Sequence, residues 1–527
     1  MKKYFGCMIS VAHSSNLTID SLKRYALYLK KFGYNMIQLY TEDAFEVDNE
    51  PYFGYLRGGY TKDELKEFVS YCDSIDMEVI PCIESLAHLG NIFKWKEYKA
   101  INDVDDVLLV DNERTYTLLE NIFKTLRECF TSKRVNVGLD EAINLGLGQY
   151  LKEHGYTSKV KIFFNHLKRI NEIANKYDFR VMMWSDMLFT ATDGNYYKVN
   201  KDRLNEIDNL VPDNVDLVYW EYFFYHEKQY EEMFDIHRMF NRELWYAGAV
   251  HDYIGFTTIN EMSEDALRAG MRACRNKKID NVLITLWGGN DCSHFQSLPA
   301  LLYAKCIYDG IENIDIIKQK FYDIVGIEYD VFASLDSANT LPMHYLKLPE
   351  ISFSKYVVFQ DVFNGFFDPV LKLGSTRKYL KKAKEFEILS QQYKEFGYLF
   401  NKQSKLLKLM YYKHDLGLLL RKAYQEHNLD KLKKLLTRLN KTIKSANEFY
   451  YAFRNEFMIE RKPQSFDIFD IQLGGLIRRL TTCKEMLISY LSGELEKIDE
   501  LEKPLLPFNG IGISYLFWER MISANFY

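Results

Sequence analysis

The first 310 or so residues alternate short apolar runs with longer segments whose apolar positions repeat at helical spacing. This alternation is typical of repeated strand–helix units around a parallel sheet. The expected strands are residues 5–11, 36–40, 78–83, 134–138, 180–184, 216–220, 243–247 and 281–287. The expected helices are residues 19–32, 61–75, 113–130, 159–176, 230–240, 263–276 and 299–308. Eight strands over roughly 250 residues predict a closed (β/α)8 TIM barrel.

The pattern changes after about Pro349. Residues 375–396, 401–427, 429–457 and 473–501 are long Leu-, Lys- and Glu-rich stretches with helical spacing. Residues 340–372, with Pro, Gly and many Phe, are the expected connector. The sequence therefore predicts an α/β fold, with a catalytic (β/α)8 barrel over residues 1–340 and an all-α C-terminal domain over residues 341–527.

Charge and composition narrow the possible partners. The formal charge of the 527-residue chain is only −5, and Lys and Arg are scattered among Asp and Glu, so no basic stripe suits nucleic acid. No apolar stretch approaches the roughly 20 residues of a membrane-spanning helix. No His/Cys/Asp cluster has zinc-like spacing, and no nucleotide-binding glycine motif is present. We therefore expect no cofactor, no metal, no nucleic acid and no membrane partner, with a homodimer as an open alternative.

The eight cysteines show no CxxC motif and no close pairing, and several lie in apolar runs. They are interpreted as reduced, buried thiols. The apolar run after Met1 is short and better explained as a first strand than as a signal peptide. The expected location is therefore the cytoplasm.

Candidate chemistry lies in the residues that follow the expected strands, because barrel enzymes form their active sites at the carboxyl ends of the strands. Acids, tryptophans and histidines recur at these positions: Glu42, Asp43, Glu84, His88, Asp140, Glu141, Trp184, Asp186, Trp220, Glu221, His251, Asp252, Tyr253, Trp287 and Asp291. One such acid often caps a helix, and one such Trp often packs in the barrel. Their coincidence at most strand ends indicates carbohydrate hydrolysis.

The segment from Val135 to Ala142 reads VNVGLDEA, and Asn144 to Gly148 read NLGLG. This stretch resembles the (H)xGxDE signature of glycoside hydrolase family 20, the β-N-acetylhexosaminidases, in a subgroup with a barrel and a C-terminal helical region. Further matching segments are LYTEDAFEV, IPCIESLAHL, MMWSDM, VYWEYF and TLWGGNDCSHFQSLP. The resemblance covers roughly residues 5–310.

The resemblance implies an exo-acting, retaining enzyme that releases terminal β-linked GlcNAc or GalNAc, plain or substituted. Glu141 would protonate the leaving oxygen, and Asp140 would orient the N–H of the substrate's 2-acetamido group. The acetamido oxygen would then attack the anomeric carbon to give an oxazolinium ion. Because side chains alternate along a strand, we expect the two acids to point different ways. A neutral Glu141 requires a raised pKa, from burial beside Asp140 and tryptophans.

The resemblance also supplies a substrate-binding set. Trp184, Trp220 and Trp287 would wall the acetamido pocket, and Tyr253 would bond the acetamido carbonyl. Asp291 would hold outer hydroxyls of the sugar. Glu42, Asp43, His88 and Glu221 complete the candidate set.

One position departs from the family pattern. Family members usually carry an Arg after the first strand, whereas the matching stretch here reads Ser10-Val11-Ala12-His13. His13 cannot supply the forked donors of an Arg. The change predicts either reduced discrimination between GlcNAc and GalNAc or a preference for a substituted sugar. The alternative is that His13 caps a loop while Arg57 reaches the sugar instead.

Two other functions stay open at this point. One is a barrel glycosidase with a carboxylate nucleophile, for which Glu42, Glu84 and Glu221 are candidates. The other is a catalytically weak glycan-binding protein, motivated by His13. In each case the expected partner is an oligosaccharide or glycoconjugate.

Overall fold

The computed structural model describes residues 3–13, 15–193, 195–197, 203–288, 291–341, 352–374, 376–507, 522–523 and 525. The chain forms two compact units. The first holds Met1–Val250, Glu261–Gly289 and Leu298–Gly326, and the second holds His251–Asn260, Asn290–Ser297 and Ile327–Tyr527. Two short segments after barrel strands thus group with the second unit. The predicted domain boundary at residue 340 stays a prediction.

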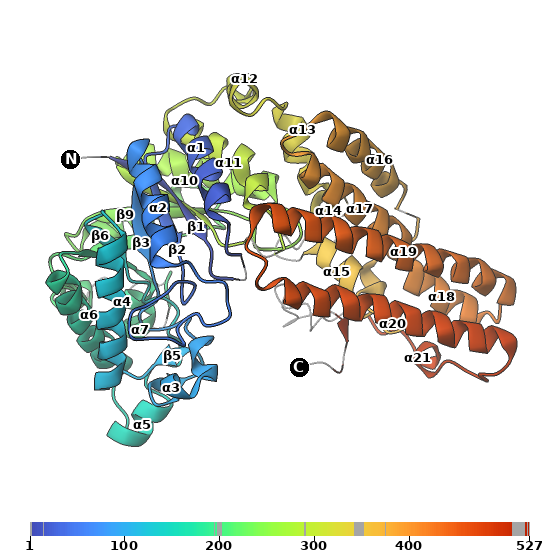
Figure 1. Cartoon of the computed structure of the whole chain (residues 1–527), viewed down its shortest axis with the longest axis horizontal. Helices are drawn as coiled ribbons and strands as arrows, with labels where there is room; N and C mark the ends of the chain where they lie inside the picture. The colour runs from blue at the N-terminus through green and yellow to red at the C-terminus, as the bar shows by residue number, and fades with distance from the viewer. Residues whose placement is uncertain are drawn as a thin grey trace. The chain divides into compact units, whose positions relative to one another are not determined.

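The first unit is a closed barrel of eight parallel strands, which confirms the predicted fold class (Figure 1). Its strands are β1 (Tyr4–Ser10), β2 (Met36–Tyr40), β3 (Glu78–Cys82), β6 (Arg134–Asn136), β7 (Arg180–Trp184), β8 (Asp216–Trp220), β9 (Leu244–Val250) and β10 (Asn281–Leu286). The barrel closes where β1 pairs with both β2 and β10. A separate antiparallel pair, β4 (Asn102–Val104) and β5 (Val107–Leu108), lies in the loop after β3.

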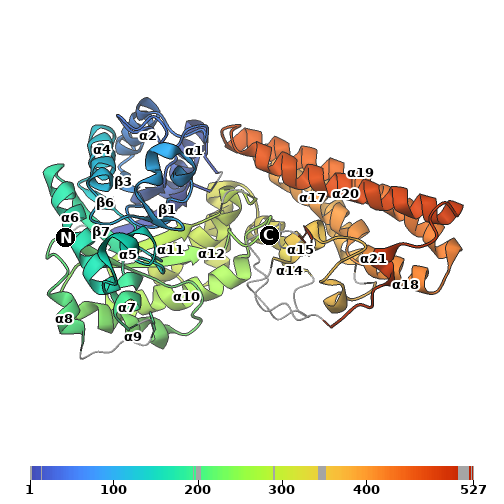
Figure 2. The ribbon, with the colours of Figure 1, turned by 90° about the horizontal axis from the view of Figure 1, so that it is seen from below.

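Helices cover the outside of the barrel (Figures 1 and 2). The main ones are α1 (Ile19–Phe32), α2 (Lys62–Ser74), α4 (Glu113–Cys129), α6 (Lys159–Lys176), α9 (Glu227–Arg238), α10 (Asn260–Lys277), α11 (Leu298–Tyr308) and α12 (Ile314–Val325). Shorter ones are α3 (Lys96–Lys99), α5 (Gln149–His154), α7 (Asp186–Asp193) and α8 (Leu204–Asp208). The ends follow local chemistry: Thr61 and Glu64 form a capping box that starts α2, and Gly33 at φ 97° ends α1.

The interior of the barrel is filled by apolar side chains from its strands, among them Met8, Met36, Ile80 and Met182. Trp184 is buried in this core, and Trp220 and Trp287 pack against it while remaining partly buried. The core therefore ends, toward the carboxyl ends of the strands, in a layer of tryptophans.

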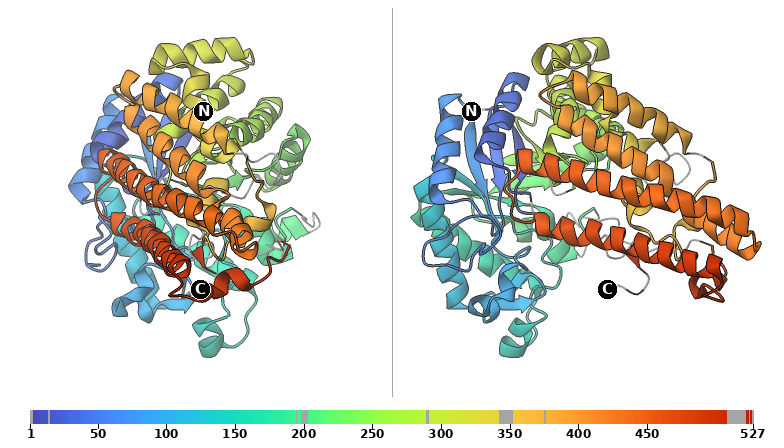
Figure 3. Two further views of the ribbon diagram at one scale, coloured as in Figure 1. Left: turned by 90° about the vertical axis from the view of Figure 1, so that its right-hand side faces the viewer. Right: turned by 45° about the vertical axis from the view of Figure 1, so that its right-hand side comes forward.

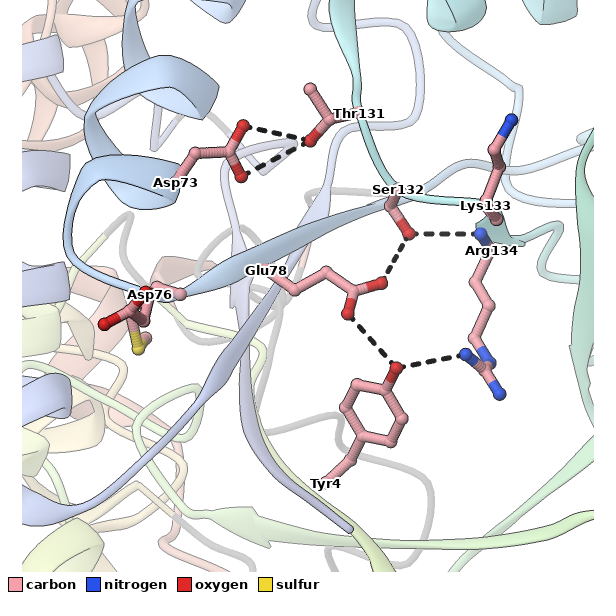
Figure 4. Close-up of a pocket in the computed structure, with 9 residues that line it drawn as sticks. Tyr4, Asp73, Asp76, Glu78, Thr131, Ser132, Lys133 and Arg134 are labelled. Carbon is pink, nitrogen blue, oxygen red and sulfur yellow. Dashed lines mark hydrogen bonds between the residues drawn. The ribbon is translucent and has the colours of Figure 1, made fainter. Parts of the chain in front are cut away.

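The opposite end of the barrel holds a cavity of about 640 Å³ (Figure 4). Tyr4, Glu78 and Arg134, the first residues of β1, β3 and β6, line it with Ser132. Tyr4 and Ser132 donate hydrogen bonds to Glu78, at 3.1 and 2.9 Å, and Arg134 donates one to the Tyr4 hydroxyl at 3.1 Å. These polar groups satisfy one another, so they stabilise the closed end of the barrel.

The fourth barrel strand is shorter than the predicted 134–138, because β6 ends at Asn136. The chain then leaves the extended conformation: Gly138, Leu139 and Glu141 have φ values of 71°, 70° and 47°. A strand cannot continue through left-handed residues. The candidate acids therefore lie on a turn.

The second unit is helical, as predicted. Its helices are α13 (Tyr329–Ala333), α14 (Ser337–Thr340), α15 (Phe353–Phe359), α16 (Arg377–Gln392), α17 (Gly397–Lys413), α18 (Leu416–Gln425), α19 (Leu429–Glu460), α20 (Phe466–Ser492) and α21 (Asp499–Glu502). The long helices α19 and α20 run side by side (Figure 3).

Three predicted boundaries in the second unit are wrong. The helix expected over 401–427 is two helices, α17 and α18, because the backbone leaves the helical conformation at Asp415, with φ −111° and ψ 14°. The last predicted helix starts earlier, at Phe466, and ends at Ser492, where Gly493 caps it at φ 82°. The connector 340–372 contains α15; residues 342–351 lie outside the described residues.

All eight cysteines are free and buried, as expected from their spacing. Across the described ranges, no helix is long and apolar enough to cross a membrane.

We expect Gly138→Ala to lower the free energy of unfolding more than Gly326→Ala does. Both glycines have positive φ, 71° and 77°, which costs an alanine about 1–2 kcal/mol. A Cβ on Gly138 would also lie 2.0 Å from Glu84 Oε2, whereas nothing lies within 4 Å of one on Gly326. Overpacking of this kind adds about 1–3 kcal/mol.

Urea denaturation of both variants measures the difference. Equal losses would contradict the close contact between Gly138 and Glu84.

Candidate active site

The turn after β6 brings the two candidate acids to one histidine. His88 Nε2 lies 3.5 Å from Asp140 Oδ2 and 3.7 Å from Glu141 Oε2. Both carboxyl groups therefore approach the same imidazole nitrogen, while the expectation that the two side chains point different ways stays a prediction. It rested on strand alternation, which does not apply to a turn with left-handed residues.

His88 comes from the loop after β3 and is itself left-handed, at φ 57°. Its backbone N–H donates to Asp106 Oδ2 at 3.1 Å, which holds the loop in place. Burial alone lowers the pKa of His88, but the hydrogen bond to Asp140 and the charges of Asp140, Glu84 and Glu141 outweigh it and raise this pKa to about 11. His88 is therefore a cation over the whole physiological pH range.

Asp140 and Glu141 differ in exposure. Asp140 is 8% exposed, and its Oδ1 is buried and has no hydrogen-bond partner within the described residues. The Glu141 side chain is 54% exposed. Partial desolvation, and then the neighbouring charge of Asp140, raise the pKa of Glu141, while His88 opposes them. The site thus presents one buried acceptor and one accessible acid.

Glu84 is a third acid at this point, and it is 1% exposed. Desolvation, and then the charge of Asp140, raise the pKa of its carboxyl well above the ordinary value. Burial thus favours the neutral form of this carboxyl over the ionised form. Glu84 fills the space behind Gly138.

The position that departs from the family pattern is occupied by an ion pair. His13 Nε2 lies 3.1 Å from Glu42 Oε1, and Glu42 also accepts a hydrogen bond from the Tyr40 hydroxyl. Desolvation lowers the pKa of His13, but Glu42 raises it by more.

Arg57 does not replace His13 as a free donor. Its guanidinium pairs with Asp43 and also donates to the carbonyl of Ala12, and its side chain is 12% exposed. Both cations are therefore engaged with acids of the β2 loop. Whether His13 or Arg57 reaches a sugar stays a prediction.

The three tryptophans form one aromatic layer with a tyrosine that the sequence analysis did not single out. The Trp184 and Trp287 ring centres lie 5.8 Å apart. Tyr222 packs on Trp220 at 5.3 Å and accepts a hydrogen bond from Trp287 Nε1 at 3.0 Å. Tyr222 could have been found from its place two residues after Trp220 at the end of β8.

Asp186 is among the acids that follow the predicted strands but is not in the predicted catalytic and binding set; it begins α7, two residues after β7 ends. Its Oδ2 accepts the backbone N–H of Glu141 at 3.1 Å, and its Oδ1 accepts the indole N–H of Trp220 at 3.2 Å. Desolvation, and then the charge of Asp140, raise the pKa of Asp186 to about 7. Asp186 therefore links the backbone of one candidate acid to the wall of the aromatic layer.

Glu221 accepts hydrogen bonds from the backbone of the residues that follow it. It is 1% exposed, and its Oε1 accepts the backbone N–H groups of Tyr222 and Phe223 at 2.9 and 2.7 Å. This arrangement shapes the turn that carries Tyr222.

Two predicted site residues belong to the second unit. Asp291 pairs there with Lys355, and its carbonyl accepts from Lys402 at 2.7 Å. Tyr253 lies in the segment after β9, with its ring 5.8 Å from that of His251. The other predicted site residues lie in the first unit. The contacts above join all of them except Tyr253 and Asp291 to neighbours at the mouth of the barrel.

In the described part of the chain, no group of three or more His, Cys, Asp or Glu side chains is placed to hold a metal ion. Acid–base chemistry by carboxyl groups is what the arrangement offers.

Comparison with known proteins identifies related sequences. Residues 35–235 match the family described as glycosyl hydrolase family 20, catalytic domain, and residues 330–513 match the glycoside hydrolase 20C C-terminal domain. Hexosaminidase D from Bos taurus is 26% identical over 208 residues, which are 37% of this chain and 56% of the relative. The match thus spans little more than half of that relative.

Solved structures with similar folds include two bacterial enzymes. One is a family 20 exo β-N-acetylglucosaminidase from Vibrio harveyi, with a TM-score of 0.49 and 13% identity, over 63% of this chain and 58% of that one. The other is a family 20 β-N-acetylhexosaminidase from Streptomyces coelicolor A3(2), with a TM-score of 0.45 and 16% identity, over 62% and 70%.

The two family matches fall on the barrel and on the helical unit, and together they take in well over half of the sequence. Their order along the chain agrees with the observed architecture. The chain belongs to glycoside hydrolase family 20.

Proposed function

We propose that this protein is an exo-acting, retaining β-N-acetylhexosaminidase that releases terminal β-linked GlcNAc or GalNAc. One observation carries the proposal: a buried carboxylate and an accessible acid meet at one histidine beside a layer of tryptophans. Flat apolar walls with few polar groups suit an acetamido group and a sugar ring. Family membership supports the same reaction class.

Glu141 is the proposed acid and base. Its carboxyl is accessible, and partial burial and the charge of Asp140 raise its pKa, which favours the protonated form that the acid step needs. It gives its proton to the glycosidic oxygen as the bond to the anomeric carbon breaks, and it later takes a proton from the attacking water. The hydrogen bond from the Glu141 backbone N–H to Asp186 fixes the position of the main chain from which this side chain extends.

Asp140 is the proposed partner of the substrate's acetamido group. Its orphaned Oδ1 is a buried acceptor, and a buried acceptor without a donor costs free energy. An acetamido N–H at this point would supply the donor. A hydrogen bond from this N–H to the Asp140 carboxylate would raise the electron density on the acetamido oxygen and make it a better nucleophile. Its attack on the anomeric carbon, with departure of the protonated leaving group, would form the oxazolinium ion, and attack of water on the same carbon would then restore the original anomeric configuration.

A carboxylate nucleophile is less well supported. Of the three candidates, Glu84 is buried, and burial raises its pKa, which disfavours the ionised form that a carboxylate nucleophile needs. Glu221 is bound to two backbone N–H groups, and Glu42 is paired with His13. Each of the three acids is thus either buried or already engaged in hydrogen bonds or an ion pair.

A weak glycan-binding protein remains the other candidate, on the evidence of His13. Its pairing with Glu42 removes a free donor from the barrel mouth. We retain the cytoplasm as the expected location, since all eight thiols are buried and unpaired.

We expect Glu141→Gln to separate two classes of substrate. Poor leaving groups, such as a sugar hydroxyl, need protonation, so kcat/KM should fall by about 100-fold to 10,000-fold. Activated aryl leaving groups need little protonation and should lose much less. Steady-state kinetics on a disaccharide and on a dinitrophenyl glycoside measure both. An equal loss on the two substrates would remove Glu141 from this role.

If the acetamido group is the nucleophile, a thiazoline analogue of the oxazolinium ion should inhibit the enzyme strongly. Such an analogue resembles a species close to the transition state, so it should bind at least about 100-fold more tightly than N-acetylglucosamine. Inhibition constants for the two compounds provide the measurement. A sugar ester trapped on any carboxylate would overturn the mechanism.

His88→Gln should move the alkaline limb of the kcat/KM profile to higher pH. The cationic His88 lowers the pKa of Glu141, so a neutral replacement lets Glu141 keep its proton to higher pH. A pH series with an unactivated substrate measures the shift. A limb that stays in place, or moves to lower pH, would show that Glu141 does not govern it.

A further inference from the structure

A cluster of three aromatic residues stands on the loops after β2 and β3. The ring centres of Tyr52, Tyr55 and Trp95 lie 5.3–5.7 Å from one another. Tyr52 and Trp95 are inclined by 37°, and Tyr55 stands at 76° and 67° to them. The three rings therefore pack as one aromatic cluster, in which Tyr55 stands across the other two.

The cluster remains open to solvent. Tyr55 is 46% exposed and its neighbour Leu56 is 74% exposed, while Tyr52 and Trp95 are half-buried. Leu56 is also left-handed, at φ 64°, a conformation that costs a residue with a Cβ about 1–2 kcal/mol. The fold thus holds apolar side chains outward at a cost in backbone energy.

Both ends of this turn are fixed on one acid of the barrel mouth. Gly54 packs so closely on Asp43 that an added Cβ would lie 2.1 Å from its carbonyl oxygen, and Arg57 pairs with the Asp43 carboxylate. Asn16 donates to the carbonyls of Arg57 and Gly58 at 2.9 and 2.8 Å. Tyr55 and Leu56 therefore lie at the tip of an anchored turn.

The same acid joins the cluster to the candidate active site. Asp43 follows Glu42, which pairs with His13, and the charge of His88 lowers the pKa of Glu42. His88 in turn contacts Asp140 and Glu141. Trp95 comes from the same loop as His88, seven residues further along. The aromatic cluster and residues of the candidate active site therefore come from the same two loops, those after β2 and β3, within one compact unit.

We propose that Tyr52, Tyr55 and Trp95 bind a sugar ring of the glycan on the leaving-group side of the cleaved bond. A pyranose has an apolar face of C–H groups that stacks on aromatic rings. Its rim of hydroxyls would meet charged groups, because Lys94 lies over the Trp95 ring at 5.5 Å. Three rings suit one sugar, whereas a stable protein interface buries about 800 Å² on each partner.

This inference rests on the proposed function, since it names the part of the substrate that lies beyond the cleaved bond. It makes the substrate an oligosaccharide, in which at least one more sugar follows the terminal residue.

The test compares Tyr55→Ala and Trp95→Ala on two substrates. One is N,N′,N″-triacetylchitotriose, and the other is the β-fluoride of N-acetylglucosamine, whose leaving group has no ring. We expect each variant to lose about fivefold to tenfold in kcat/KM on the trisaccharide, as the loss of one stacking contact predicts. The fluoride should lose less than twofold. Tyr322→Ala is the matched control, because Tyr322 is 47% exposed on α12.

Equal losses on both substrates, or no loss on either, would overturn the inference. The thermal unfolding temperature of each variant identifies a folding defect, because such a defect would lower both activities together.

If the wild-type protein cleaves neither substrate, the proposed function fails. Calorimetric binding of the trisaccharide then decides whether the aromatic cluster binds a sugar. Binding that Trp95→Ala weakens and Tyr322→Ala does not would support it. Binding that Trp95→Ala leaves unchanged, or no binding at all, would overturn it.

Discussion

The crowding of carboxyl groups at the mouth of the barrel is the constraint on which the candidate site depends. Glu42, Glu84, Asp140, Glu141 and Asp186 come from four loops and converge because parallel strands end on one side. Like charges that share a poorly hydrated space cannot all ionise. Burial and mutual repulsion therefore raise the pKa of Glu84, Glu141 and Asp186, while His88 and His13 act as the compensating cations.

The backbone geometry of the turn after β6 gives the two candidate acids different environments. Left-handed residues between Gly138 and Glu141 turn the chain out of the strand, so that Asp140 is buried and Glu141 is exposed. Asp186 holds the turn to the tryptophan layer through two hydrogen bonds. Position and protonation of the proposed acid thus depend on the same few contacts.

The helical unit has its own network of buried charges. Lys402 pairs with Glu456 and donates to the carbonyl of Asp291, and Arg461 donates to the carbonyl of Cys292. Ser293 donates to Glu460 at 2.6 Å. Buried ionic groups are costly unless they are paired, and they favour one arrangement over others. The segment that follows β10 is therefore held by the helices with which it forms a compact unit.

Hydrophobic periodicity determined the barrel, the order of its strands and most helix boundaries, because burial depends on local patterns that repeat along the chain. The DE pair and the tryptophans were also evident, since each lies at the end of a strand or within a few residues after it. Only the tertiary structure brought both acids to His88, linked Asp186 to Trp220, paired Arg57 with Asp43 and gathered Tyr52, Tyr55 and Trp95. These contacts join residues that are far apart in sequence or follow left-handed turns, and hydrophobic periodicity carries no signal for either.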